Sequence, residues 1–191
     1  MLVERNQSRA RESVQPAVVS KAATRRWYAA RTRPRAEKAA YRALSANGVE
    51  CYLPVVEQER QWADRIKRVE FPLFPGYLFI FCMRRQIGSV LAGVPGLIDV
   101  IRQDGRPCVV REDELFAVRV LVEGMRRTGK LPTVSDYPVI GNPVRVIEGP
   151  FKGLTGTLVE DRHASRVVVR ISAVRMAAGI ELDRTSIRPR R

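Results

Sequence analysis

The order of apolar and polar residues predicts alternating strands and helices over the first two thirds of the chain. Aromatic residues of high β propensity indicate a first strand at 27–31. Apolar residues at helical spacing predict a helix from Pro34, which is tolerated at a first helical position, to Gly48, which suits a left-handed cap. A second helix is expected at about 112–127, with acidic residues first and basic residues last. Together these segments predict a sheet with helices packed on it.

The segment EFPLFPGYLFIFCM, residues 70–83, is an apolar stretch within an arginine-rich chain. Successive side chains of a strand point to opposite faces. One face of this strand would carry Tyr77, Phe79 and Phe81, and the other Leu78, Ile80 and Cys82. Two interpretations remain open: protein covers both faces, as in a central buried strand, or the aromatic face is partly open and binds a partner.

Shorter elements are expected around this stretch. Alternation at 49–53 predicts a strand, and the polar segment after it turns at Ala63-Asp64. A single helical turn is expected at 86–92, and Asp104-Gly105 is a hairpin signal.

The last third of the chain has a different pattern. Residues 128–139 lack periodicity and are rich in Pro, Ser, Thr and Gly, which predicts a linker. Residues 140–191 contain four or five short strands separated by turn signals. This pattern predicts a small all-β barrel.

A formal net charge of +14 is spread over the whole chain. A positive charge of this size favours a protein that acts close to a polyanion, but it does not show which polyanion. Residues 1–24 are expected to be a disordered basic tail without a signal peptide. Because no apolar run is long enough to span a bilayer, we expect no membrane partner and a cytoplasmic location.

The chain offers little for catalysis. The cysteines, Cys51, Cys82 and Cys108, form no CxxC pair and are expected to be free thiols. With one histidine, His163, in a turn-like segment, a zinc site lacks ligands. No phosphate-binding glycine loop or HExxH motif is found. We therefore expect neither an enzyme, nor a metal, nor a cofactor.

Several segments, in order, resemble the amino-terminal domain of the NusG family of transcription elongation factors: RRWYAARTRPRAEKAAYRAL, GVECYLPVV, FPLFPGYLFIF, VPGLIDVI and PCVVREDEL. GNPVRVIEGPFKGLTGTLVE resembles the family's KOW motif. The resemblance implies an α+β fold. An amino-terminal α/β sandwich at 25–127, an antiparallel sheet with flanking helices, would precede an SH3-like β-barrel at 140–191. ARTRPRAEK and RQWADRIKRVEFPLFPGY are more similar to specialised, operon-targeted members, the RfaH-like and capsule-locus regulators, than to the housekeeping factor.

This resemblance implies a monomeric antitermination factor that binds RNA polymerase and suppresses pausing or termination, on selected operons. The surface for the β′ clamp helices would comprise Phe74, Pro75, Tyr77, Phe79 and Val100. The contact to the β gate loop would fall at Gly88 and Ser89, where the polar threonine run of the RfaH type is missing.

Nucleic-acid contacts are also implied. Specialised members touch the non-template DNA strand at the positions of Arg31, Arg33, Arg35 and Lys38. Guanidinium groups suit phosphates and unpaired bases, but a solvated helix start explains these residues equally well.

In the KOW segment, a tight turn between the first two barrel strands is expected from Gly149, Pro150, Phe151, Gly153 and Gly156. The family's barrel recruits a ribosomal protein or Rho through a loop with the pattern FGR, where this chain has Val174 and Arg175. The β-branched segment RVVVRIS favours a barrel over the helical state of one paralog. The alternative function is that of a ribosome-binding or RNA-binding protein acting through the KOW domain.

Overall fold

The computed structural model describes residues 24–61, 65–136, 141–161 and 164–190. Three expectations lie outside these residues: the disordered tail up to residue 23, the turn at Ala63-Asp64, and the loop position of His163.

The amino-terminal part is built on an antiparallel sheet with β1 (Arg25–Thr32) at its centre. Strand β5 (Tyr77–Met83) pairs along one side of β1, and β2 (Cys51–Tyr52) lies outside β5. On the other side β1 pairs with β6 (Leu97–Val100) and with β9 (Val109–Val110). The apolar stretch at 70–83 therefore supplies an inner strand of the sheet.

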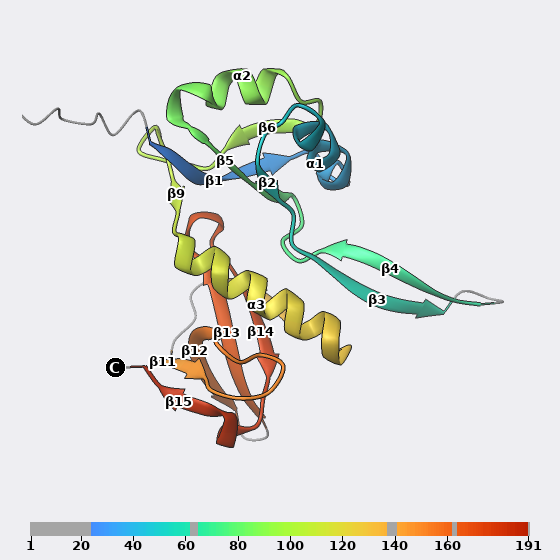
Figure 1. Ribbon diagram of the computed structural model, residues 1–191, viewed down its shortest axis with the longest axis vertical. Helices are drawn as coiled ribbons and strands as arrows, with labels where there is room; N and C mark the ends of the chain where they lie inside the picture. The colour runs from blue at the N-terminus through green and yellow to red at the C-terminus, as the bar shows by residue number, and fades with distance from the viewer. Residues whose placement is uncertain (1–23, 62–64, 137–140, 162–163, 191) are drawn as a thin grey trace, which may run out of the picture.

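Two helices cover one face of this sheet. Helix α1 (Glu37–Ala46) and helix α2 (Ile87–Ala92), which follows the short helix η2 (Arg84–Gln86), lie on the same side in Figure 1. They enclose a core that includes Leu44, Leu78 and Ile80. The long helix α3 (Glu112–Thr128) lies on the other side of the sheet. The expected strand alternation is confirmed, because Leu78 and Phe79 belong to different cores.

Helix α1 starts three residues later than the sequence predicts. Pro34 precedes the helix in a turn, and Arg35 adopts the left-handed conformation with φ +61°. An L residue with a positive φ cannot continue a right-handed helix, so the helix begins at Glu37. The expected end is confirmed, since Gly48 has φ +68°.

Two hairpins branch from this domain. Strands β3 (Val55–Gln61) and β4 (Ile66–Pro72) form a long ribbon that projects away from the sheet in Figure 1. Strands β7 (Arg102–Gln103) and β8 (Arg106–Pro107) form a small one. Its turn residues Asp104 and Gly105 have φ values of +50° and +72°, so the predicted hairpin is confirmed.

The carboxy-terminal part is a six-stranded antiparallel sheet in the order β10-β14-β13-β12-β11-β15. Its strands are β10 (Thr133–Asp136), β11 (Asn142–Val146), β12 (Thr155–Asp161), β13 (Ala164–Ile171), β14 (Met176–Glu181) and β15 (Ile187–Pro189), with short helices η3 (Ser172–Val174) and η4 (Arg184–Ser186). The α+β class is thereby confirmed. The segment 128–139 is not a structureless linker as expected, because β10 pairs with β14. Strand β10 has only four residues, too few for the alternation of apolar and polar side chains to indicate a strand in the sequence.

Helix α3 joins the two parts. Figure 1 shows it between the amino-terminal sheet and strands β13 and β14. We call the carboxy-terminal six-stranded sheet the barrel. On its side of α3, the Ser172 hydroxyl donates to the Glu114 carboxylate at 2.7 Å, and the Phe151 ring packs over Gly124. Phe79 and Phe151 consequently belong to one continuous apolar core.

Candidate functional site

Five aromatic side chains occupy the sheet face opposite α1 and α2: Trp27, Tyr52, Tyr77, Phe79 and Phe81. We call this set the aromatic face. The rings of Trp27 and Phe81 are 5.1 Å apart between centroids, and those of Tyr52 and Phe79 stack at 6.3 Å. Such ring pairs add to the stabilisation from burial and fix the orientation of each ring. The face is therefore a rigid apolar layer.

Cationic side chains border the aromatic face. The guanidinium of Arg25 lies 4.5 Å from the Phe81 ring centroid, and that of Arg119 on α3 lies 5.1 Å from the Tyr52 centroid. Burial raises the pKa of Tyr52 to about 12, although Arg119 acts in the opposite direction. The Tyr52 hydroxyl therefore keeps its proton at neutral pH and remains a hydrogen-bond donor.

A third cation lies within this face. Arg31 on β1 is directly opposite Tyr77 on β5 and Asp99 on β6, and side chains opposite one another across a sheet share a face. Hydrogen bonds from Arg102 lower the pKa of the Asp99 carboxyl, and the charge of Arg31 adds to this effect, although burial acts in the opposite direction. Asp99 is thus ionised near neutral pH.

The residues expected to contact the clamp helices do not form one accessible patch. Phe74 and Phe79 have no exposed surface, while Tyr77 is half-buried and Pro75 is exposed. Val100 is 3% exposed and belongs to the core beneath α1 and α2. The expectation that Val100 shares a surface with Phe79 is wrong, since the two side chains point to opposite faces of the sheet.

Sequence reasoning missed the parts of the surface that other elements contribute. Trp27 alternates with Ala29 on β1, and this period could have placed it beside Phe81. No local sequence pattern could have placed Arg119 at this surface, because its position over the Tyr52 ring depends on how α3 packs on the sheet.

Gly88 and Ser89 lie together in α2, and both are exposed. The Ser89 hydroxyl donates to the carbonyl of Gln86 at 2.9 Å, which closes the preceding turn. A side chain added at Gly88 would meet no described atom within 4 Å. These two residues are thus accessible, on an element that covers the face opposite the aromatic one.

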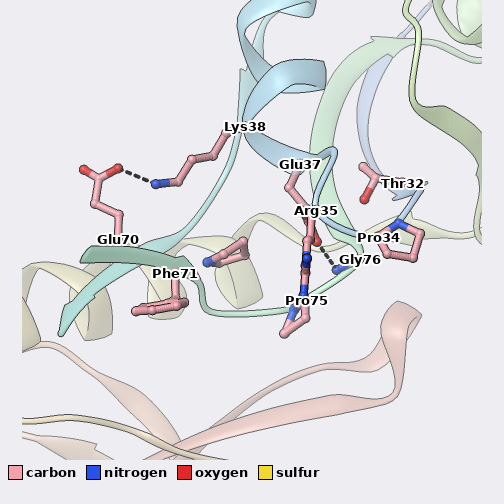
Figure 2. Close-up of a pocket in the computed structure, with 10 residues that line it drawn as sticks. Thr32, Pro34, Arg35, Glu37, Lys38, Glu70, Phe71, Pro75 and Gly76 are labelled. Carbon is pink, nitrogen blue, oxygen red and sulfur yellow. Dashed lines mark hydrogen bonds and ion pairs between the residues drawn. The ribbon is translucent and has the colours of Figure 1, made fainter. Parts of the chain in front are cut away.

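The four basic residues expected to bind nucleic acid lie between the end of β1 and the first turn of α1. Arg31, Arg33 and Arg35 are exposed, whereas Lys38 forms an ion pair of 2.9 Å with Glu70 on β4. Figure 2 shows Arg35 and Lys38 lining a pocket between α1 and the segment that joins β4 to β5. The structure brings these two residues together, while Arg31 and Arg33 are not among the pocket's lining residues.

The turn of the KOW segment differs in part from its prediction. Gly149 and Gly153 have φ values of +76° and +92°, as expected for a tight turn between β11 and β12. Gly156 instead lies within β12, where a side chain would overlap the carbonyl of Val168. Phe151 is buried against α3, so this residue has a packing role beyond the turn. Pro150 is exposed beside it.

The helices in the described part of the chain are all too short or too polar to cross a membrane.

Comparisons with known proteins agree with this architecture. The family model described as transcription termination factor NusG matches residues 25–119. A transcription termination/antitermination protein NusG from Vibrio vulnificus is 25% identical over 177 residues, which cover 86% of this chain and 96% of that protein. The protein of the same name from Rickettsia bellii is 31% identical over 124 residues, which cover 63% of this chain and 62% of that protein.

A solved structure has the same fold. The structure titled "Domain interaction in Thermotoga maritima NusG" superposes with a TM-score of 0.51 at 21% identity, covering 89% of this chain and 99% of that one.

Proposed function

Because the chain belongs to the NusG family, we propose that it binds RNA polymerase through the aromatic face and thereby suppresses pausing or termination. It is a transcription elongation factor and not an enzyme. In this proposal it acts as a monomer in the cytoplasm, and the β′ clamp helices of the polymerase are the element that the aromatic face receives.

The observation that carries this proposal is a rigid ring layer that remains partly open. Tyr52, Tyr77 and Phe81 are each only partly buried. Phe79 is fully buried on the same face of β5, and its ring contacts that of Phe74 edge-on with the centroids 6.3 Å apart. Fixed aromatic side chains suit binding hot spots, because they lose little entropy on association.

The charges around the aromatic face favour a particular kind of partner. Arg25, Arg31 and Arg119 are exposed next to its rings. A helical hairpin whose apolar stripe is flanked by acidic side chains would match this arrangement, since opposite charges steer association and fix the register of an interface.

We propose Gly88 and Ser89 as a second, smaller contact to the β gate loop, because both are exposed.

A contact with the non-template DNA strand is the third part of the proposal. Arg31 at the end of β1, Arg33 just after it and Arg35 in the turn before α1 are exposed cations. A guanidinium can pair with phosphate in a bidentate manner or stack on a base. Lys38 would first have to leave Glu70. Service to selected operons, as in the specialised members, stays a prediction.

The alternative, a protein that acts on ribosomes or RNA through its barrel, has less support. Val174, in the loop expected to bind a ribosomal protein or Rho, is buried, and the neighbouring Ser172 is bonded to Glu114 of α3. Phe151 is buried against the same helix. A ribosomal or RNA partner that binds the barrel at this loop and at Phe151 would have to displace α3.

Replacing Tyr77 by alanine tests the proposal. We expect the full-length variant to bind purified core polymerase about thirtyfold more weakly, as for a hot-spot residue, while its circular dichroism spectrum is unchanged. Binding is measured by biolayer interferometry on immobilised polymerase.

The matched control is Tyr41→Ala, which removes another partly exposed tyrosine from α1, on the other side of the sheet. This variant should bind like the unmodified protein. Equal affinities for the Tyr77 and Tyr41 variants would contradict the proposal and favour a function of the barrel.

A further inference from the structure

A tight turn leads into β5 and carries residues of the proposed polymerase surface. It consists of Phe74, Pro75, Gly76 and Tyr77, and we call it the β5 turn. The Tyr77 N–H donates to the Phe74 carbonyl at 3.2 Å, and Gly76 has φ +82°. A proline in the second position and a glycine with positive φ in the third are the features of a type II turn. Pro75 and Tyr77, two of the expected polymerase contacts, thus lie on either side of Gly76.

The peptide between Pro75 and Gly76 has two accessible orientations. Type I and type II turns differ in the direction of this central peptide, and the third residue has a negative φ in one and a positive φ in the other. Glycine adopts both signs of φ at little cost. A flip from type II to type I would turn the Gly76 N–H to the other side of the β5 turn and change the backbone next to Pro75 and Tyr77.

A carboxylate from α1 holds the central peptide in its type II orientation. Glu37, the first residue of α1, accepts a hydrogen bond from the Gly76 N–H at 2.7 Å, as the dashed line in Figure 2 shows. A distance this short is typical of a hydrogen bond to an ionised group, which is stronger than one between neutral groups. The Thr32 N–H donates to the Gly76 carbonyl at 2.8 Å. Both polar groups of Gly76 are therefore bonded to segments outside the β5 turn.

The burial of Glu37 indicates that it does more than stabilise the fold. The residue is only 6% exposed and forms no ion pair with any residue that the structure describes. A buried carboxylate loses hydration, and its place at the start of α1 offsets only part of this cost. An apolar side chain would avoid the cost, but it could not accept the hydrogen bond from Gly76.

We propose that Glu37 is a positioning residue for polymerase binding, which fixes the β5 turn in its type II form and so presents Pro75 and Tyr77 to the partner in one conformation. This inference rests on the proposed function and names a residue of α1, outside the aromatic face, on which that face depends. A surface fixed before association loses little conformational freedom when it binds. A β5 turn that samples two orientations would bind in proportion to the fraction that is competent.

The substitution Glu37→Ala tests this proposal in the full chain. We expect it to bind immobilised core polymerase about tenfold more weakly, because a hydrogen bond to a charged group no longer selects the competent orientation. Glu37→Gln keeps a side-chain carbonyl that can accept from the Gly76 N–H, although without a charge. Its affinity should therefore stay within about threefold of that of the unmodified protein. Both affinities are measured by biolayer interferometry.

The matched control is Ala40→Gly, at a fully buried position in the same helix. Glycine lowers the stability of a helix interior, so the Tm of this variant should fall. Its affinity for polymerase should not change, because the bond between Glu37 and Gly76 remains. Equal losses of affinity in Ala40→Gly and Glu37→Ala would show that Glu37 acts only through stability, and would overturn the proposal.

The amide resonance of Gly76 gives a readout that a general loss of stability would not move. In a ¹⁵N-labelled full chain, the short bond to a carboxylate should shift the Gly76 amide proton downfield. We expect this resonance to move upfield in Glu37→Ala, by less in Glu37→Gln, and not at all in Ala40→Gly. A Gly76 resonance that stays in place in Glu37→Ala would contradict the proposed role of the carboxylate.

A double-mutant cycle separates this inference from the proposed function. In a Tyr77→Ala background, Glu37→Ala should weaken polymerase binding by less than about threefold, because most of its effect passes through Tyr77. The full tenfold loss in both backgrounds would overturn the proposal. If Tyr77→Ala alone binds like the unmodified protein, the proposed function itself fails. If Tyr77→Ala binds weakly and Glu37→Ala binds like the unmodified protein, only the positioning role of Glu37 fails.

Discussion

Replacing Phe79 by alanine is expected to lower the free energy of unfolding by about 3–5 kcal/mol, the range for a buried phenylalanine truncated to alanine. Phe79 has no exposed surface and packs against the rings of Tyr52 and Phe74. Its removal leaves a cavity within the aromatic face that these rigid neighbours cannot close. Urea denaturation of the full chain, followed by circular dichroism, measures the loss as a lower midpoint.

Phe116→Ala makes the same chemical change on α3 at a residue that is 59% exposed. It should change the free energy of unfolding by no more than about 0.5 kcal/mol. Equal shifts in the two variants would contradict the buried position of Phe79. The comparison also explains why Tyr77, and not Phe79, is the residue to replace in a binding experiment: loss of binding in a Phe79 variant would not separate contact from folding.

The second large effect is expected at Gly124, where α3 meets the barrel. Alanine in a helix interior is normally more favourable than glycine by about 0.5–1 kcal/mol. Here the added methyl group would overlap the ring of Phe151. Gly124→Ala is therefore expected to destabilise the full chain by about 1–3 kcal/mol, the usual effect of an overpacked core.

The sign of this effect should depend on Phe151. In a Phe151→Ala background the methyl group no longer meets a ring, so Gly124→Ala should become neutral or stabilising by up to about 1 kcal/mol. Urea denaturation of the four proteins of this double-mutant cycle measures the coupling. Additive effects would show that α3 and the barrel are not packed through these two residues.

Local patterns were enough to predict much of this fold. The ends of α3, the Asp104-Gly105 hairpin and the two-sided character of β5 follow from period, charge and turn residues within short windows. The late start of α1 could not be predicted in this way, because the chain before the helix contacts distant segments. The Arg33 N–H donates to the Gly96 carbonyl at 2.8 Å, and Arg35 two residues later has a left-handed conformation.

The candidate site was predicted less completely than the fold. Alternation along β5 separates Tyr77 from Leu78, but it cannot show that α3 and the barrel bury Phe79 from the other side. Glu114, Ala117 and Gly124 form a second buried stripe on α3. A glutamate and two small residues carry no apolar signal, so the contact between the helix and the barrel was missed, and with it the extent to which the aromatic face is covered.

Crosslinking can show whether the aromatic face receives the β′ clamp helices. A photoreactive benzoylphenylalanine is placed at residue 77 of the full chain, which is mixed with purified core polymerase, irradiated and analysed by mass spectrometry. We expect crosslinks to the clamp helices of β′, and none there from the same group at residue 41. Crosslinks from residue 77 to another part of the polymerase, or to none of it while the protein remains bound, would contradict the claim.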